Sequence, residues 1–392
     1  GIILKNFGKS QEAFVSYLKS IEINPTVSEV YRSISIFLKE ADLSQLDKSK
    51  IKEILNTLLK RNDVNHSDFL FKAFKFTYKK EFTKNIEKSD SVLLKKEIFP
   101  KFMNDEIIIN SIKKIIFKDP NWELMLTKLR KDVCYSIANQ TIEIKNWEFN
   151  IIIAMAEQCF SNEYIYSVNE EENKSLEKII SICKKGNLNE INLSLLACYF
   201  PLYKLLDQIP SIKDFKSINN NFTKLLKVQL FEPLEEIRIS KEIKKIGSIT
   251  DHISQKVRSQ YEENPYPRWR SESSSKVSKS SAIVIINNDI KPNSISSTLE
   301  SNPLKVLIAG CGTGIQIILA QKYINAQITA IDISSASLSY AQRKINEKGI
   351  KNVNLFQMDI LEVALLKEQF DIIECCGVLH HMGDPQKGLK AL

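Results

Sequence analysis

Apolar residues recur along much of the chain at the three- and four-residue spacing that gives an α-helix one apolar face. Three sets show this spacing clearly: Ile51, Ile54, Leu55, Leu58 and Leu59; Trp122, Leu126, Leu129 and Val133; and Leu195, Leu196, Tyr199, Tyr203 and Leu206. Asn, Asp and Pro residues punctuate the pattern, as at Asp119-Pro120 and at Pro201. We therefore expect an α-helical array over residues 41–250, with each set on one helix face.

Residues 1–40 contain a more specific pattern. Gly8 to Pro25 reads Gly-Lys-Ser-Gln-Glu-Ala-Phe-Val-Ser-Tyr-Leu-Lys-Ser-Ile-Glu-Ile-Asn-Pro, and it resembles the second helix of a tetratricopeptide repeat, with Ala13 and Phe14 packing and Pro25 ending the unit. The repeat consensus is lost after Lys39. We interpret residues 1–40 as a repeat remnant, and such helical repeats imply a possible protein partner.

After residue 303, short apolar runs replace the helical spacing. Four runs have the character of strands, and segments with helical spacing separate them: Val306–Ala309, Gln327–Ile331, Val353–Phe356 and Phe370–Cys375. Ser334 or Ser335 can cap one intervening helix and Gly349 can end it, while Asp384 and Pro385 can begin another. Strands that alternate with helices usually form a parallel sheet. The chain as a whole is therefore predicted to be a multidomain protein of the α + α/β class.

The first of these runs leads into three glycines, Gly310, Gly312 and Gly314. Glycine lets the chain turn sharply and lets a ligand approach backbone N–H groups, and a helix that begins there favours an anionic group. Asp332 ends the second run 18 residues after the last glycine, where an acidic side chain can accept hydrogen bonds from a ribose. Ile315 occupies the position of the third glycine of a dinucleotide site, which favours a single nucleoside with a carboxylate.

Residues 303–392 resemble the first part of a class I S-adenosylmethionine-dependent methyltransferase. The resemblance rests on Val-Leu-Ile-Ala-Gly-Cys-Gly-Thr-Gly at 306–314, Ile-Asp-Ile at 331–333, Met-Asp-Ile at 358–360, and Phe-Asp-Ile-Ile followed by Gly-Val-Leu-His-His-Met-Gly-Asp-Pro at 377–385. It implies a Rossmann-like sheet and S-adenosylmethionine as cofactor. The implied cofactor-binding residues are Gly310, Cys311, Gly312, Thr313, Gly314, Asp332, Ile333, Asp359, Ile360, Cys376 and Gly377.

Two further expectations concern the chemistry of this site. His380 and His381 follow the fourth strand, and either imidazole can act as a general base for a hydroxyl or amine acceptor or can simply orient the loop. Ile308 stands where the resembled family often has an acid that helps to hold the ammonium group of the cofactor. Cofactor binding is then weaker or relies on a substitute acid, for which Glu374 is the candidate.

Residues 251–302 separate the helical array from this region. The string Tyr-Glu-Glu-Asn-Pro-Tyr-Pro-Arg-Trp at 261–269 resembles one that precedes the methyltransferase domain in bacterial proteins with tetratricopeptide repeats, so we assign the whole chain to that type. Two roles stay open for the string. It can be a lid whose aromatic residues cover the cofactor or substrate while Arg268 pairs with an anionic group, or it can be interdomain packing. Residues 271–302 are predicted to be a Ser-rich linker with a short docking element at Ala282–Ile286.

Composition narrows the remaining functions. The formal charge is +8, but the lysines are spread among acidic residues, so no nucleic-acid partner is expected. The seven cysteines lack Cys-x-x-Cys spacing, and no cluster has metal-ligand spacing, so no metal site is predicted. His66 is expected at the surface or in a cap. No apolar run is long enough to span a membrane and no signal pattern is present, which predicts a cytoplasmic protein.

The sequence leaves two rivals to methyl transfer. One is a non-catalytic scaffold with a vestigial nucleotide fold, which Ile308 favours, and the other is an NAD-dependent oxidoreductase, which Ile315 disfavours. The methyl acceptor, which is expected to be a small molecule or a protein, is not identified by any motif. The chain starts without Met and stops after four strand signals, whereas the resembled enzymes have seven strands, so we expect it to be a fragment.

Overall fold

The computed structural model describes residues 1–85, 102–141, 143–270, 279–296 and 303–392. The described chain forms two compact units, residues 1–233 and residues 234–392 without the omitted segments. None of the described helices is long and apolar enough to cross a membrane.

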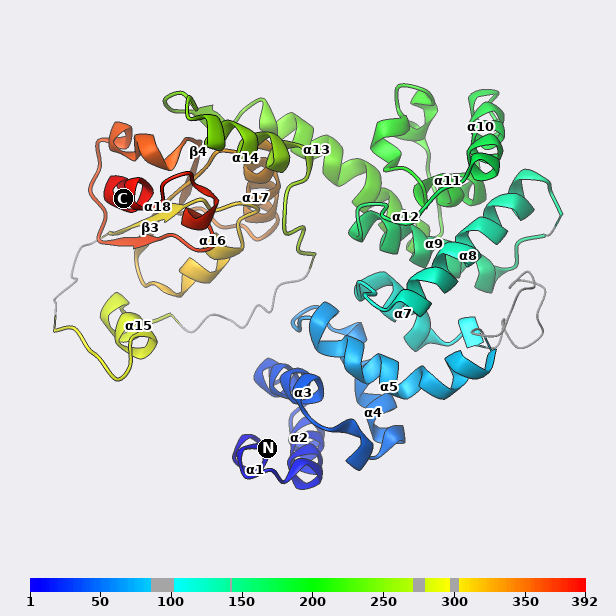
Figure 1. The fold of residues 1–392 in the computed structure, drawn as a ribbon, viewed down its shortest axis with the longest axis horizontal. Helices are drawn as coiled ribbons and strands as arrows, with labels where there is room; N and C mark the ends of the chain where they lie inside the picture. Colours follow the sequence, from blue (N-terminus) through cyan, green and yellow to red (C-terminus); the bar gives the residue numbers. More distant parts are fainter. Residues whose placement is uncertain (86–101, 142, 271–278, 297–302) are drawn as a thin grey trace. The chain divides into compact units, whose positions relative to one another are not determined.

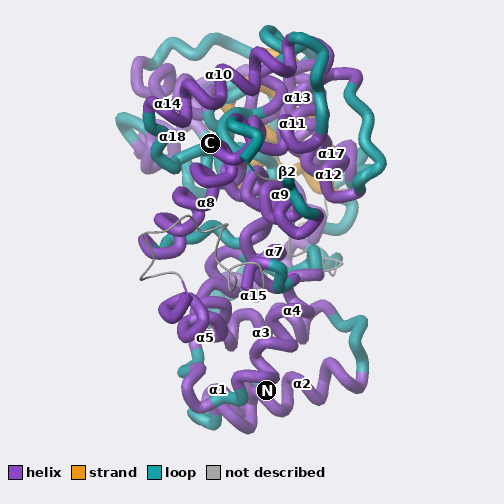
Figure 2. The backbone as a smooth tube through the Cα atoms, turned by 90° about the vertical axis from the view of Figure 1, so that its right-hand side faces the viewer, coloured by secondary structure: helices purple, strands orange, loops and turns teal. Residues whose placement is uncertain are grey.

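The regular secondary structure in the described part of the first unit is helical (purple in Figure 2), with loops between the helices. Short 3-10 turns at Leu43–Gln45, Leu202–Leu205 and Pro210–Asp214 and a π-helical turn at Lys227–Phe231 connect the longer elements. The α-helices are α1 (Ile2–Asn6), α2 (Ser10–Ile23), α3 (Ser28–Glu40), α4 (Lys48–Lys60), α5 (Ser67–Asn85), α7 (Glu106–Lys114), α8 (Pro120–Ala138), α9 (Asn146–Ser161), α10 (Glu170–Lys184), α11 (Glu190–Ala197), α12 (Asn220–Leu226) and α13 (Glu232–Ser240), the last of which runs into the second unit.

The polar punctuation of the sequence begins several of these helices. Asp119 accepts hydrogen bonds from the N–H groups of Asn121 and Trp122, and Pro120 occupies the first turn of α8. Asn169 and Glu172 form a capping box at α10. The predicted apolar faces of α4 and α8 are buried, which confirms the periodicity.

One expectation for this unit is wrong, and another holds in one of its two alternatives. The third apolar set does not form one helix, because α11 ends at Ala197 and Pro201, which cannot continue a helix, separates it from the 3-10 turn that follows. For His66, the surface alternative is wrong, because the side chain is buried. The capping alternative agrees with the structure, since its Nε2 lies 3.2 Å from the carbonyl oxygen of Leu58 in the last turn of α4.

The second unit contains a five-stranded parallel sheet in the order β1-β4-β3-β2-β5 (orange in Figure 2). Its strands are β1 (Lys244–Lys245), β2 (Leu304–Ala309), β3 (Ala326–Asp332), β4 (Val353–Gln357) and β5 (Ile372–Glu374). The four predicted strands are therefore present, and β1, which lies inside the range expected to be helical, adds a fifth. After β4 the chain returns to the other side of β2, so the strand order reverses between β2 and β5.

Helices and 3-10 turns connect and flank these strands. The α-helices are α14 (His252–Glu263), α15 (Ala282–Asp289), α16 (Ile315–Leu319), α17 (Ser335–Glu347) and α18 (Pro385–Ala391). Ser334 caps α17 and Asp384 caps α18, as expected. Residues 282–286 of the predicted linker belong to α15, while much of the rest of that linker lies outside the described residues.

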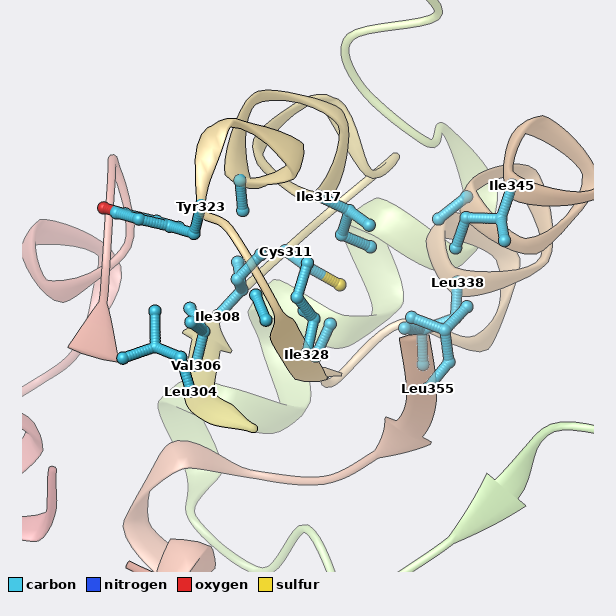
Figure 3. Close-up of a cluster of buried hydrophobic side chains, with 14 of the residues drawn as sticks. Leu304, Val306, Ile308, Cys311, Ile317, Tyr323, Ile328, Leu338, Ile345 and Leu355 are labelled. Atoms are coloured by element: carbon cyan, nitrogen blue, oxygen red, sulfur yellow. The ribbon is translucent and has the colours of Figure 1, made fainter. Parts of the chain in front are cut away.

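Both faces of β2 are buried, which explains why its sequence is almost continuously apolar. Val306 and Ile308 face Ile317 of α16 and Leu338 of α17 on one side (Figure 3). On the other side, Leu307 packs in a second cluster with Ile331, Met358 and Val363. Apolar packing on both faces therefore stabilises the sheet.

Candidate functional site

A cavity of about 320 Å³ opens at the carboxyl edge of the sheet, a size suited to a small ligand. This is the edge at which open α/β folds bind ligands. The segments that follow β2, β3, β4 and β5 line it, together with α14 and the residues after it. The lining residues are Ser254, Val257, Tyr261, Tyr266, Pro267, Gly310, Cys311, Gly312, Thr313, Ile315, Gln316, Asp332, Ile333, Ser337, Met358, Asp359, Ile360, Cys376, Gly377, Val378, His381 and Met382.

The three glycines of the loop after β2 differ in how much space surrounds them. A Cβ at Gly310 would lie 2.4 Å from a methyl group of Val378, and one at Gly314 would lie 2.7 Å from the Cβ of Ala341. At Gly312 the nearest atom would be the carbonyl oxygen of Tyr266, 3.8 Å away. Gly312 is therefore the position where the loop leaves space for a ligand, and Gly314 is not among the residues that line the described cavity.

Four backbone N–H groups of this loop are already bonded within the chain. The N–H groups of Gly310 and Cys311 donate to the carbonyl of Ile331, and that of Gly314 donates to the carbonyl of Cys311. The N–H of Gly312 donates to Asp332. These four N–H groups therefore stabilise the loop itself in this conformation, and α16 is only five residues long. The binding of an anionic group by backbone N–H groups at this turn stays a prediction.

Asp332 occupies the end of β3 beside the glycine loop. Its Oδ2 accepts from the N–H of Gly312 at 2.7 Å and its Oδ1 from the N–H of Ser334 at 2.9 Å. Burial raises the pKa of this carboxyl to about 6, and the nearby negative charge of Glu262 adds to the rise. The two backbone N–H bonds act in the opposite direction. Each carboxylate oxygen keeps a further lone pair for a ligand hydroxyl.

The segment after β4 supplies Met358, Asp359 and Ile360. Asp359 is 4% exposed and caps the following 3-10 helix (Ile360–Leu366) through the N–H of Leu361 at 3.0 Å. Ile333 and Ile360 also line the cavity and add apolar surface to it. Apolar side chains together with a carboxylate suit a flat heterocycle with a polar edge.

The two lining cysteines have different environments. Cys311 is buried in the sheet core (Figure 3), and burial together with the Asp332 charge raises the pKa of its thiol well above the usual range. Cys376 is exposed, and it precedes Gly377 at the β5 end of the cavity. The Cys311 thiol is therefore a packing group, and only the Cys376 side chain is open to solvent.

The two candidate histidines differ in whether they line the cavity. His381 lines the cavity and its ring meets that of Tyr261 edge to face, with the ring centroids 6.2 Å apart. The His380 ring lies 4.1 Å from that of His381 but is not among the lining residues of the described chain. His381 is thus the better placed base.

The proposed substitute acid is engaged elsewhere. The Glu374 carboxylate accepts from the Tyr323 hydroxyl at 2.8 Å and lies 3.7 Å from the Lys322 ammonium. Ile308 pairs with Glu374 across the sheet and is 1% exposed in the core. Neither residue lines the cavity within the described chain, so the role suggested for Glu374 is not supported.

Residues 306–392 match a family model described as a methyltransferase domain. Residues 306–392 therefore form a methyltransferase domain. An uncharacterised protein of Synechococcus sp. is 44% identical over 90 residues, which is 22% of this chain and 22% of that protein. Ubiquinone biosynthesis O-methyltransferases of Pseudomonas fluorescens and Stutzerimonas stutzeri are 35% and 33% identical over 106 residues, 26% of this chain. The chain spans 44% of the length of these two enzymes.

Several residues that line the cavity carry no signal in the sequence. Ser254 and Val257 of α14 and Ser337 of α17 are among them, and the Ser337 Oγ is buried with no hydrogen-bond partner in the described chain. Tyr261 and Tyr266 belong to the aromatic string, for which the sequence left a lid and interdomain packing both open.

The residues of the aromatic string make different contacts. Tyr261, Tyr266 and Pro267 line the cavity. Trp269 is only 9% exposed and packs against Ile318 and Tyr340 instead. Arg268 lies 3.8 Å from Glu236 rather than beside the cavity. The string is therefore an integral wall of the domain, and the pairing of Arg268 with an anionic ligand is not supported.

Proposed function

We propose that this protein is an S-adenosylmethionine-dependent methyltransferase. The observation that carries the proposal is the convergence of the segments after β2, β3, β4 and β5 on one cavity beside Asp332. The match of residues 306–392 to a methyltransferase domain supports it independently.

Two features of the cavity are compatible with the cofactor. Gly312 leaves open space where a side chain would intrude, and Ser337, whose buried hydroxyl has no partner in the described chain, is among the lining residues. Asp332 would hold the ribose, and Asp359 with Ile360 would hold the adenine. Gly310 to Thr313 and Cys376 to Gly377, which line the cavity, would border the methionyl end. The bound cofactor supplies an electrophilic methyl group on a sulfonium.

The chain's own contribution is mainly to position the acceptor and to remove its proton. Alignment of the reacting groups can contribute several kcal/mol toward the barrier. His381 lines the cavity close to Tyr261 and would accept the acceptor proton at a ring nitrogen. Because two relatives are O-methyltransferases by name, we propose a hydroxyl oxygen as the acceptor.

The first unit would serve recognition. We propose that α2 (Ser10–Ile23), which lies within the repeat-like Gly8–Pro25 segment, belongs to a tetratricopeptide-type array that binds a protein partner in the cytoplasm. In-cell crosslinking that places every partner contact within residues 234–392 would contradict this assignment.

Equilibrium binding tests the central proposal. S-adenosylhomocysteine should bind the protein in a calorimeter, NAD should not, and Asp332→Asn should weaken binding by about tenfold or more through loss of hydrogen bonds to a charged group. Binding of NAD alone would indicate an oxidoreductase, and binding of neither ligand would indicate the scaffold. Both outcomes would overturn the proposal.

A turnover assay addresses the base. With labelled methyl donor at a saturating concentration and a panel of phenols, catechols and amines, the wild type should transfer methyl groups at a measurable rate. His381→Gln should lower that rate, and His380→Gln should lower it less, because only His381 of the two lines the described cavity. A His381→Gln rate equal to the wild-type rate would remove the base assignment.

One observation from the sequence favours a non-catalytic scaffold, namely that the apolar Ile308 stands where an acid is expected. Ile308 lies in the sheet core and not in the cavity wall of the described chain, so its replacement of an acid removes no group that faces the ligand. Whether it weakens cofactor binding stays a prediction. A measurable methyl-transfer rate would exclude the scaffold.

A further inference from the structure

The segment Asp251–Arg270, which comprises α14 and the aromatic string, contacts both loops that border the cavity. Its N-terminal part, α14, lies alongside α17, which begins just after Asp332 (Figure 1). Its C-terminal part contacts the glycine loop through Pro267 and Trp269. The segment therefore touches the ribose side and the methionyl side of the proposed site at once.

On the ribose side, Glu262 binds the first turn of α17. Its Oε1 accepts from the N–H of Ser335 at 2.9 Å, and its Oε2 accepts from the N–H of Ala336 at 3.0 Å and from the Ser335 hydroxyl at 3.1 Å. A carboxylate at the N-terminus of this 13-residue helix is also favoured by the helix dipole. These bonds fix the turn that follows Asp332.

The turn itself continues to the Asp332 carboxylate. The Ser334 hydroxyl donates to the carbonyl of Tyr261 at 3.0 Å, and the N–H of Ser334 donates to Asp332 at 2.9 Å. Ser334 is fully buried. Asp332 is thus joined to α14 through one residue, and its position follows the position of that helix.

On the methionyl side, two bonds tie the segment to Thr313. The Trp269 Nε1 donates to the carbonyl of Thr313 at 3.0 Å, and the Thr313 hydroxyl donates to the carbonyl of Pro267 at 2.7 Å. The Tyr340 hydroxyl holds the carbonyl of Trp269. Because the N–H of Gly312 also donates to Asp332, both loops meet at one carboxylate.

We propose that the segment Asp251–Arg270 is a clamp for the cofactor site, in which Glu262 is a positioning residue that acts on the ligand through Asp332. The proposal rests on the proposed function, because it assumes that Asp332 holds the ribose. Glu262 works in two ways. Its bonds to α17 fix the geometry of the turn, and its negative charge disfavours ionisation of Asp332.

Other charged groups share this environment and must be separated from Glu262. Arg258 lies 3.5 Å from the Glu262 carboxylate, and Gln357 donates to it at 3.4 Å. Asp359 and His381 line the same cavity. Among these groups of the described chain, Glu262 is the one that also hydrogen-bonds to the first turn of α17. Variants that change its charge and its side-chain length separately therefore distinguish its two effects.

The test measures the Kd of S-adenosylhomocysteine by calorimetry for Glu262→Gln, Glu262→Asp and the matched control Glu263→Gln, an exposed neighbour outside the cavity lining. Both Glu262 variants should weaken binding by about tenfold, because each loses charge-assisted bonds to the α17 turn. The control should stay within about twofold. Wild-type failure to bind would refute the proposed function, whereas equal binding by wild type and both Glu262 variants would refute only the clamp.

Two further measurements show whether Glu262 acts through Asp332. In an Asp332→Asn background, Glu262→Gln should change the Kd by less than about twofold, because coupled residues are not additive. Glu262→Gln should also move the midpoint of the Kd against pH profile to lower pH, and Glu262→Asp should leave it in place. An additive double variant, or an unmoved midpoint in Glu262→Gln, would overturn the proposal. If Glu262→Gln does not fold, Ser335→Ala, which removes one hydroxyl donor, should show a smaller loss of affinity, and unchanged affinity would count against the clamp.

Discussion

The titration of Asp332 makes a quantitative prediction for cofactor binding. Its pKa is about 6 in the ligand-free protein, mainly because the carboxyl is removed from water. A ribose diol donates hydrogen bonds best to the ionised carboxylate, so protonation competes with the ligand. From this pKa, the Kd of S-adenosylhomocysteine should weaken about twofold at pH 6 and about tenfold at pH 5, relative to about pH 7.5.

The stability contribution of Asp332 has the opposite sign, which separates this effect from acid unfolding. Its folded-state pKa lies above the unfolded value, so the folded protein binds this proton more tightly. Asp332 therefore adds stability as pH falls through about 6, in the same range where it loses affinity for the ligand. Calorimetric titrations at constant ionic strength, with circular dichroism at each pH, measure both. Asp332→Asn should show weak binding at every pH. A flat wild-type Kd between pH 7.5 and 5 would refute the reasoning.

Three other predictions concern packing and stability. Gly314→Ala should destabilise the protein by about 1 to 3 kcal/mol in urea unfolding through steric overlap with α17, and Gly349→Ala, also at positive φ but with open space, should cost less. Equal losses would contradict the steric argument. Trp269→Ala should cost about 3 to 5 kcal/mol, measured in the same way, because it empties a buried site, and a loss under 1 kcal/mol would contradict this. Burial lowers the pKa of His66 to about 4, so the folded protein binds this proton more weakly than the unfolded chain does. The free energy of unfolding should therefore fall by about 3 kcal/mol as pH falls from 6.5 to 4. His66→Gln should flatten the stability profile over that range, and an unchanged profile would contradict the assignment.

Much of the sheet was predictable because its strands are short, apolar and separated by helical spacing. β2 is buried on both faces, and such a strand has a continuous apolar sequence. β1 had no such signal, since its residues are Lys244 and Lys245 and both are exposed. Its strand character comes from pairing with β4, which is a long-range contact that local sequence does not encode.

The candidate site was predictable to the same degree. Asp332, Asp359 and the glycine loop follow strand ends, so their meeting at one edge follows from parallel topology. The bond from the N–H of Gly312 to Asp332 was not predictable, because it depends on the side-chain conformation of Asp332. Nor was the contribution of α14, because an amphipathic helix does not indicate which surface it covers.

The pairing of β1 with β4 affects how the second unit is made. Lys245 lies beside Gln357, so about 110 residues must be synthesised before the edge strand finds its neighbour. Closing so large a loop is entropically costly and slow compared with local pairing. A polypeptide cut just ahead of residue 306, where the family match starts, would lack this strand and leave β4 uncovered. The stretch before the recognisable motifs thus completes the sheet as well as the cavity wall.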